Sequence, residues 1–495
     1  MLDQTLKPMK QLNLDISAKN GSQAMYLRLS RAIRKAIKSR QLQPDEQLPS
    51  ARLLGEQLSL NRHTIMAAYH ELIAEGWLES RQRKGYFVVS SLPVDSSQTV
   101  AIGNSSANTT EQVFNWRLIK GQGALPERRV GLCDYNFSGG GPDISLFPFK
   151  QFAGYVSDSL SRPNIPALNY GDNIGFGPFI EQIEIYLRRM RSLTGKKIVI
   201  VNGSQEALFL LAKVLLQPGD KVAVEKLGYQ PAWAAFRDSA VELIGVNQDQ
   251  HGIDPAHLEQ LASAHQLRLI YLTPLHQYPT TVTLSVSRRL QIYQIAAKYK
   301  IPIVEDDYDH EFHYRCQPLA PMAADDPLGL VIYLSTFSKI MFPGIRLGFI
   351  AVEQTLADAL VNYRSLTNHK PNVVMQDAIA RWMADGAFER QLRKLTRTYE
   401  QRRNAMVALL QDYQRHGIKL DFVVPDGGMA MWIKTDFDAA ELERKAMENS
   451  IFIQSENSFH LCQQDSENRY IRLGFAAMNE TMMAEGLALL FSGLV

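Results

Sequence analysis

The segment TFSKIMFPGIRLG, residues 336–348, places one lysine in an otherwise apolar stretch. Lys339 is flanked by the hydroxyl residues Thr336 and Ser338, and Arg346 follows seven positions later. A charged amine in apolar surroundings is disfavoured unless it has a partner or a chemical task. The alternative is that both cations are surface charges on a loop, so the choice depends on the residues that accompany them.

The elements that must position this lysine are predicted by a pattern that begins near residue 135. Short apolar runs (KIVIV, KVAVE, LRLIYL, IPIVED and LVIYLS) alternate with helical patterns. This alternation predicts an α/β domain with a largely parallel sheet, in which ligands gather at the carboxyl ends of the strands. Lys339 follows the last of these runs, the turn Gly203–Gln205 follows the first, and the carboxylate-rich EDDYD ends another.

A lysine, a carboxylate and a phosphate-binding turn at strand ends are the groups that pyridoxal 5'-phosphate requires. Lysine forms a Schiff base with this cofactor, a carboxylate keeps the pyridine nitrogen protonated, and hydroxyls, amides and arginine hold the phosphate. Gly203, Ser204 and Gln205 precede a predicted helix, whose first N–H groups suit a phosphate. We therefore expect Lys339 to be the Schiff-base residue and Arg346 to reach the same phosphate.

Residues 135–495 resemble the fold type I aminotransferases. The resemblance is carried by YGDNIGFGPFIEQI, GSQ, EKLGYQPA, EDDY and RYIRLGFA. It implies that Tyr170 reaches the phosphate of a partner subunit and that Tyr229 stacks on the pyridine ring. It also implies that Arg472 grips the α-carboxylate of a substrate or effector, a task for which a bidentate guanidinium is suited.

Within EDDY the resemblance assigns two further roles. It implies that the carboxylate of Asp306, or alternatively that of Asp307, pairs with the pyridine nitrogen of the cofactor. It also implies that the hydroxyl of Tyr308 binds the ring oxygen. The chain departs from the family at HQYPTT, where many members read Asn-Pro-Thr-Gly. The asparagine contact to the ring oxygen is therefore either missing or supplied by His276. The pair of histidines in HEFH, residues 310–313, lacks further ligands at metal-binding spacing, so we expect packing or surface roles and no metal site.

The first ninety residues have the pattern of a DNA-binding module. Residues 25–37 have apolar side chains, including Met25, at helical spacing, and LPSARLLGEQLSL and NRHTIMAAYHELIAEGWL predict two further helices joined by a tight turn, with Ser50 and Asn61 as caps. A second helix that begins with polar and basic residues is typical of the recognition helix of a helix-turn-helix. The predicted DNA contacts on these helices are Arg52, Arg62, His63 and Thr64.

The run LESRQRKGYFVV predicts a β-hairpin with a basic tip, a wing that adds Arg81, Arg83 and Lys84 to the predicted DNA contacts. The alternative is a generic three-helix module with a solvated basic rim. Helices and wing together resemble the winged helix-turn-helix of GntR-type regulators over about residues 20–90. The wing departs from that family's Gly-rich tip, so preference for a DNA half-site does not transfer.

Composition and charge agree with a basic DNA-binding segment followed by a larger, different domain. Of 495 residues, 45% are hydrophobic and 21% charged, which is ordinary for a globular protein of two or more domains. Residues 1–90 carry 14 Lys and Arg against 8 Asp and Glu, whereas the remainder is slightly acidic.

Without a long apolar run or an apolar leader, the sequence predicts a cytoplasmic protein that does not enter a membrane. Cys133, Cys316 and Cys462 have no disulfide or zinc spacing and are expected to be reduced.

The expected order is a winged helix-turn-helix domain (1–90), a polar linker rich in Ser, Thr, Asn and Gln (91–130), and an aminotransferase-like domain (131–495). This order resembles the MocR subfamily of GntR-type regulators. The resemblance implies a homodimer arranged head to tail that binds double-stranded DNA and senses an amino-acid effector or a vitamin B6 form through aldimine chemistry. The alternatives are a working aminotransferase with an accessory DNA-binding domain, and a DNA-binding protein whose large domain only dimerises.

Overall fold

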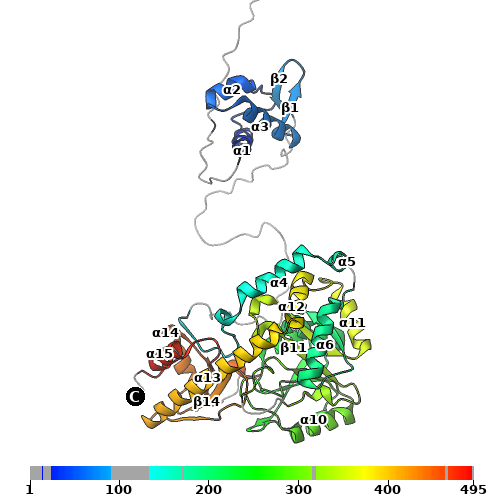
Figure 1. Cartoon of the computed structure of the whole chain (residues 1–495), viewed down its shortest axis with the longest axis vertical. Coiled ribbons are helices and arrows are strands. Elements are labelled where there is room, and N and C mark those ends of the chain that lie inside the picture. The colour runs from blue at the N-terminus through cyan, green and yellow to red at the C-terminus, as the bar shows by residue number, and fades with distance from the viewer. Residues whose placement is uncertain are drawn as a thin grey trace, which may run out of the picture. The chain divides into compact units, whose positions relative to one another are not determined.

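The computed structural model describes residues 14, 24–90, 133–169, 172–314, 319–462 and 467–492. The chain divides into two compact units, residues 1–117 and 118–495 (Figure 1). The predicted linker, together with Tyr170 and Cys316, lies outside the described residues. None of the helices in the described part of the chain is long and apolar enough to cross a membrane.

The N-terminal unit is a winged helix-turn-helix, as the sequence predicts. It contains α1 (Met25–Lys38), α2 (Ala51–Leu58), α3 (Arg62–Ala74) and a hairpin of β1 (Leu78–Arg81) and β2 (Gly85–Val88). The apolar faces of the helices meet in one core, which includes Leu29, Ile33, Leu54, Ile65, Tyr69 and Leu72. Met25, which the periodicity placed on the same face, is 38% exposed because it is the first residue of its helix.

Local hydrogen bonds fix the ends of the two helices of the motif. The side chain of Ser50 accepts from the Leu53 amide at 3.3 Å, and that of Asn61 accepts from the His63 amide at 2.9 Å. Each bond satisfies an amide that the helix itself leaves unpaired. Gly76, with φ +77°, follows the end of α3 and lets the chain turn into the wing.

The large unit is built on a seven-stranded mixed sheet. Its order is β4 (Lys197–Val201), β12 (Gly348–Val352), β11 (Val331–Thr336), β10 (Ile303–Asp306), β9 (Leu267–Leu272), β5 (Lys221–Glu225) and β6 (Glu242–Val246). Only β12 runs antiparallel to its neighbours. The prediction of a largely parallel sheet is confirmed, although β6, β12 and the second sheet described below were not among the predicted strands.

Helices cover both faces of this sheet, and alternate strand residues show the division. Val199 and Val201 pack with α7 (Ser204–Leu215), α8 (Gln230–Arg237) and α11 (Gln354–Arg364). Ile198 and Ile200 belong to the core of the other face. The helices of that core include α6 (Gly177–Arg191), α9 (Pro255–Ala264), α10 (Val286–Tyr299) and α12 (Val373–Ala384). A sheet buried on both faces has near-continuous apolar strands, which is the pattern in the sequence.

The C-terminal part adds a smaller antiparallel sheet of β13 (Leu420–Phe422), β14 (Ala430–Thr435), β17 (Tyr470–Gly474) and β16 (Gln454–Ser455). The helices α13 (Ala387–Arg415), α14 (Ala439–Glu448) and α15 (Glu480–Leu490) belong to this part (Figure 1). Near the start of the unit, β3 (Tyr135–Asn136) pairs in parallel with β15 (Ile451–Phe452), so the segment after β3 lies beside the smaller sheet. The remaining α-helices and strands of the described residues are α4 (Phe149–Ser161), α5 (Ile165–Leu168) and the short hairpin of β7 (Gln248–Asp249) and β8 (Gly252–Ile253).

Candidate functional site

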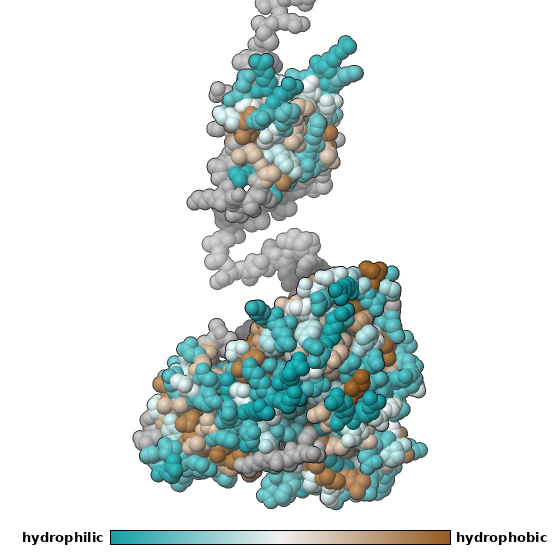
Figure 2. Space-filling view, in the orientation of Figure 1, coloured by the Kyte–Doolittle hydropathy of each residue, from teal (hydrophilic) through white to brown (hydrophobic). Residues whose placement is uncertain are grey.

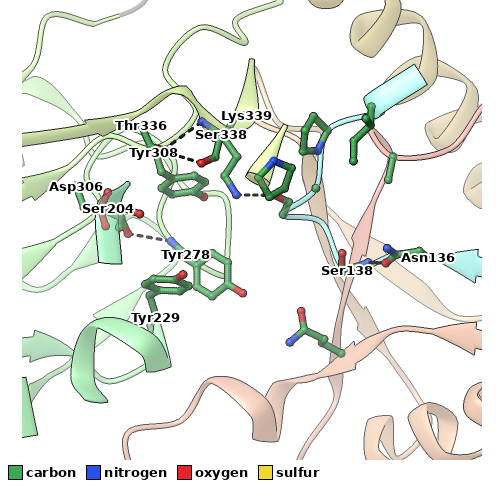
Figure 3. A pocket seen from close by; sticks show the side chains of 18 of the residues that line it. Asn136, Ser138, Ser204, Tyr229, Tyr278, Asp306, Tyr308, Thr336, Ser338 and Lys339 are labelled. Atoms are coloured by element: carbon green, nitrogen blue, oxygen red, sulfur yellow. Dashed lines mark hydrogen bonds between the residues drawn. The ribbon is translucent and has the colours of Figure 1, made fainter. Parts of the chain in front are cut away.

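A cavity of about 460 Å³ lies at the carboxyl ends of the parallel strands, where the topology predicts a ligand site. The large sheet contributes residues at the ends of β9, β10 and β11, and the segments of β3, β15 and β16 form the opposite side (Figure 3). Eight of the predicted cofactor residues line it: Ser204, Tyr229, Asp306, Tyr308, Thr336, Ser338, Lys339 and Arg346.

Lys339 ends a single 3-10 turn (Phe337–Lys339) that follows β11 directly. Thr336 caps this turn, since its Oγ1 accepts from the Ser338 amide at 3.2 Å. The lysine extends into the cavity, where Nζ donates to the carbonyl of Gly140 and lies 6.0 Å from the centre of the Tyr308 ring (Figure 3). The end of β11 therefore places a primary amine in the cavity.

The adjacent carboxylates Asp306 and Asp307 point in different directions. Asp306 lines the cavity, its Oδ2 accepts from the Tyr271 hydroxyl at 2.9 Å, and its buried Oδ1 has no hydrogen-bond partner among the described residues. Asp307 instead forms a buried ion pair with Arg191 and accepts from the Tyr333 hydroxyl at 2.7 Å. Oδ1 of Asp307 is also buried without a hydrogen-bond partner among the described residues, but Asp307 does not line the cavity. Of the two alternatives in the sequence, Asp306 is therefore the one that a ligand in the cavity can reach.

The different surroundings of Asp306 and Asp307 also shift their pKa values in opposite directions. Burial raises the pKa of Asp306 to about 7, although the Tyr271 hydrogen bond and the nearby Lys339 act in the opposite direction. Burial would also raise the pKa of Asp307, but Arg191 and His310 outweigh it and lower that pKa to about 2. A cation placed at Oδ1 of Asp306 would stabilise its ionised form.

The turn between β4 and α7 forms a cradle with Arg346. Gly203 has φ +82°, and a Cβ atom there would lie 3.2 Å from Nη2 of Arg346. Nη2 donates to the carbonyl of Asn202 at 2.9 Å, which holds the guanidinium against the turn. Ser204 is the first residue of α7 and faces the cavity, whereas Gln205 donates to the carbonyl of Pro231 and is not among the lining residues. Amides, a hydroxyl and a cation thus meet at one helix N-terminus, a combination that suits phosphate.

Tyrosines form one wall of the cavity. The ring of Tyr278 lies edge-on to that of Tyr229, with centroids 5.3 Å apart (Figure 3). The hydroxyl of Tyr308 donates to the carbonyl of His276 at 3.0 Å. His276 itself is buried and not among the lining residues, since its Nδ1 lies 2.7 Å from Oδ1 of Asp309. The alternative in which the His276 ring replaces the missing asparagine is therefore not the arrangement in this structure.

Arg472 lies immediately behind the lining residues, on β17. Its Nη1 donates to the carbonyl of Ser138 at 3.1 Å, its Nε donates to that of Pro279 at 3.3 Å, and its guanidinium covers the face of Tyr278 at 4.5 Å. Gly139 must lack a side chain, because its φ is +68° and a Cβ there would lie 2.5 Å from Nη1. The predicted carboxylate-binding arginine is thus adjacent to the cavity and is held by two backbone carbonyls.

These positions fit pyridoxal phosphate. The unpartnered Oδ1 of Asp306 suits a protonated ring nitrogen, the Gly203 cradle suits a phosphate, and the Lys339 amine lies between Asp306 and the opposite wall. Tyr170, expected to reach the phosphate of a partner subunit, lies outside the described residues.

The histidines of HEFH pack inside the large unit. Nε2 of His310 lies 3.1 Å from the Tyr186 hydroxyl, and the ring of His313 lies 5.1 Å from that of His276. The described residues contain no group of three or more His, Cys, Asp or Glu side chains that could hold a metal ion.

The predicted DNA contacts of the N-terminal unit lie mainly on its surface. Arg62 and His63 are exposed in the first turn of α3, and Thr64 beside them is half-buried. Arg52 is exposed on α2 and pairs with Glu56 at 3.1 Å. The start of the recognition helix therefore presents polar groups that the core does not use.

The wing separates its three cations into two kinds. Arg83 and Lys84 are exposed at the tip, where hydrophilic side chains gather (Figure 2). Arg81 pairs with Asp45 and Glu79, and its guanidinium lies 4.4 Å from the centre of the Phe87 ring. These contacts favour a structural role for Arg81, in addition to or in place of the predicted DNA contact.

Several lining residues were missed by sequence reasoning. Tyr271 and Thr273 lie at the end of β9, and the rule that directed attention to the other strand ends would have found them. Asn136, Ser138 and Gln454 come from short elements distant in sequence, for which no local signal exists. Tyr278 was noted only as a departure from the family pattern.

Both units of the chain are similar to known protein families. Residues 164–490 match the family "Aminotransferase class I and II", and residues 25–88 match "Bacterial regulatory proteins, gntR family". The probable rhizopine catabolism regulatory protein MocR of Rhizobium meliloti is 32% identical over 82% of this chain and 81% of its own length. The HTH-type transcriptional regulator TauR of Rhodobacter capsulatus is 27% identical over 95% of this chain and 96% of its own length.

Among solved structures, the kynurenine aminotransferase of Pyrococcus horikoshii is similar to the large unit. It has 28% identity and a TM-score of 0.67, covering 72% of this chain and 89% of its own. The two family matches occur in the order that the sequence predicts. The chain therefore belongs to the MocR-type GntR transcription regulators, in which a winged helix-turn-helix is followed by a class I and II aminotransferase domain.

Proposed function

We propose that this regulator binds pyridoxal phosphate at Lys339 and uses it to sense an amino acid or a vitamin B6 form, with a consequent change in its affinity for DNA. The single observation that carries the proposal is that Asp306 lines the cavity with Lys339 and Arg346 while its buried Oδ1 has no partner in the described part of the chain. A buried carboxylate oxygen without a partner is costly, and a protonated ring nitrogen removes that cost.

Each lining group then has a task. Lys339 supplies the primary amine, Asp306 holds a proton on the ring nitrogen, Tyr229 supports the ring, and Ser204 with Arg346 holds the phosphate. Bound pyridoxal phosphate would supply an aldehyde that condenses with amines and a ring that withdraws electrons. The hydroxyls of Thr336 and Ser338 complete the polar side of the cavity next to the lysine.

Arg472 would allow the site to select amino acids by their carboxylate. Its guanidinium adjoins the cavity on the side of Ser138 and Tyr278, so it can pair with the α-carboxylate of an amino acid whose amine faces Lys339. An effector alters DNA binding only if it binds the two arrangements of the protein unequally, and a tenfold change in operator affinity requires about 1.4 kcal/mol of coupling.

The N-terminal unit would read DNA with Arg62 and the residues beside it, while Arg83 and Lys84 contact phosphates. Its membership of the gntR family supports DNA binding. A head-to-tail homodimer, in which Tyr170 of each subunit reaches the phosphate held by the other, belongs to the same proposal.

A working aminotransferase is the second candidate. The observation that favours it is the similarity of the large unit to solved aminotransferases, with the amine and the carboxylate both retained in the cavity. A third candidate, a large domain that only dimerises, gives no task to Asp306, Lys339 and Arg346, which line one cavity.

Electrophoretic mobility shifts on the DNA upstream of the protein's own gene distinguish these candidates. The regulator predicts an affinity that changes with pyridoxal phosphate and with at least one of a panel of amino acids. Steady multiple-turnover transamination, together with an operator affinity that no amino acid or B6 form changes, would support the enzyme. Absence of a visible cofactor absorbance band would support the scaffold.

A further inference from the structure

The side of the cavity next to Arg472 contains a second polar residue, Gln454. The two residues are direct partners in the antiparallel pairing of β16 with β17, and such partners project to the same face of a sheet, about 5 Å apart. Gln454 lines the cavity. If Arg472 holds the α-carboxylate, as the proposed function requires, the rest of the effector lies within reach of the Gln454 carboxamide.

Tyr278 borders the same space from the other wall. Its ring is fixed by Arg472 on one face and by edge-on contacts with Tyr229 and Phe459, whose centroids lie 5.3 and 5.5 Å away. Its hydroxyl points into the cavity, on the side away from Asp306 (Figure 3). The ring cannot turn aside without losing these contacts, so the hydroxyl is a fixed feature of the pocket.

The hydroxyl of Tyr278 and the carboxamide of Gln454 are available to hydrogen-bond a ligand. Within the described residues, neither the Tyr278 hydroxyl nor the Gln454 carboxamide has a hydrogen-bond partner. Nδ2 of Asn136, on the same side of the cavity as Gln454, has none either. All three groups are neutral. Together they can satisfy a side chain that both donates and accepts hydrogen bonds.

The described charged residues that line the cavity are all assigned to the cofactor, so none of them remains to pair with a charged side chain of the effector. Among the described lining residues the charged side chains are Asp306, Lys339 and Arg346, which the proposed function assigns to the cofactor. A second carboxylate or ammonium on the effector would therefore be desolvated without a counter-ion. A purely apolar side chain would leave the neutral polar groups unpaired when water is displaced.

We infer that the effector is an α-amino acid with a neutral, hydrogen-bonding side chain, an amide or a hydroxyl, and that Tyr278 and Gln454 are the residues that select it. This inference rests on the proposed function, since it takes Arg472 as the carboxylate site.

The test compares amino acids of matched shape on the full-length, cofactor-loaded protein. The probes are asparagine and aspartate, glutamine and glutamate, and threonine and valine, each titrated while the visible absorbance of the cofactor is recorded. We expect the tightest binder to be asparagine, glutamine or threonine, with its matched partner at least about tenfold weaker. An acidic amino acid or valine as the tightest binder would overturn the selectivity and leave the sensing function intact. No response to any of the six probes would also overturn this inference, whereas the sensing function fails only if no amino acid or B6 form changes operator affinity in the mobility shifts.

Variants test whether the two residues cause the selectivity. Gln454→Lys supplies the missing cation and should shift preference toward the acidic member of each pair, and Tyr278→Phe should narrow the difference between threonine and valine. Gln250→Lys, at an exposed position away from the cavity, is the matched control and should leave the selectivity unchanged. Selectivity unaffected by both Gln454→Lys and Tyr278→Phe would exclude these residues as its source.

Discussion

Lys339 and Arg472 donate hydrogen bonds to carbonyl oxygens two residues apart in one segment. Nζ of Lys339 binds the carbonyl of Gly140, and Nη1 of Arg472 binds that of Ser138 at 3.1 Å. Each side chain has further N–H groups for an effector, since an ammonium has three donors and a guanidinium five. The segment 138–140 is therefore in contact with each of the two groups that we expect to bind the effector.

Gly139→Ala tests this connection. The new Cβ would lie 2.5 Å from Nη1 of Arg472 at a backbone φ of +68°, so we expect the arginine to be displaced and the chain to lose about 1–3 kcal/mol of stability. The effector response should be lost while the cofactor absorbance stays. Gly154→Ala is the control, since a Cβ there meets no atom within 4 Å and Gly154 does not line the cavity. A normal response from the Gly139 variant would show that the segment and Arg472 do not need this close contact.

Lys339→Ala should abolish the visible absorbance of the loaded protein and the adduct trapped by borohydride, because it removes the primary amine in the cavity. Absorbance spectra and mass spectrometry of the reduced protein measure both. Lys197→Ala removes an exposed lysine of the same unit and should change neither. A borohydride adduct that persists in the Lys339 variant would assign the amine to another residue.

The neighbouring carboxylates should respond oppositely to neutralisation. Burial raises the pKa of Asp306 to about 7, so the folded, cofactor-free protein keeps a proton that the unfolded chain releases above about pH 4. Asp306 therefore makes the free energy of unfolding fall as pH rises from about 4 to 7. Asp306→Asn should reduce that fall and weaken cofactor binding.

Asp307→Asn should instead destabilise the protein at pH 7, by about 3–5 kcal/mol, because it leaves Arg191 buried without its carboxylate. Denaturant unfolding of both variants between pH 4 and 8 provides the comparison. Equal destabilisation by the two substitutions would contradict the distinct roles of the carboxylates.

Much of the architecture could be predicted from local pattern. The five predicted strands of the large sheet are present because a doubly covered sheet requires continuous apolar runs, and Ser50 and Asn61 cap their helices as their side chains favour. Strand ends meet at one edge of a parallel sheet, which is why Lys339 and the carboxylates of EDDYD could be expected near one cavity. The choice of Asp306 among those carboxylates came from the family resemblance.

The remainder of the site depends on distant pairing. Gln454 reaches the cavity only because β16 pairs with β17, and Asn136 only because β3 pairs with β15. Neither register has a signal in the local sequence. The partnering of Arg81 with Asp45 was missed for the same reason, since the two residues are far apart along the chain.

Arg62→Ala should weaken operator binding by about 1–3 kcal/mol without changing the cofactor spectrum, because Arg62 is exposed at the start of the recognition helix. Arg81→Ala should mainly lower the thermal stability of the N-terminal unit, since it removes contacts to Asp45, Glu79 and Phe87. Binding isotherms and thermal unfolding of both variants separate these effects. Wild-type operator affinity in the Arg62 variant would remove this residue from the interface.

The most direct measurement of the central claim is a titration of one cofactor-loaded sample with amino acid, in which operator affinity and cofactor absorbance are recorded together. We predict that both change with the same midpoint, and that Arg472→Ala abolishes both responses while retaining the initial absorbance and basal DNA binding. An amino acid that changes the absorbance at every concentration tested while operator affinity stays constant would contradict the account.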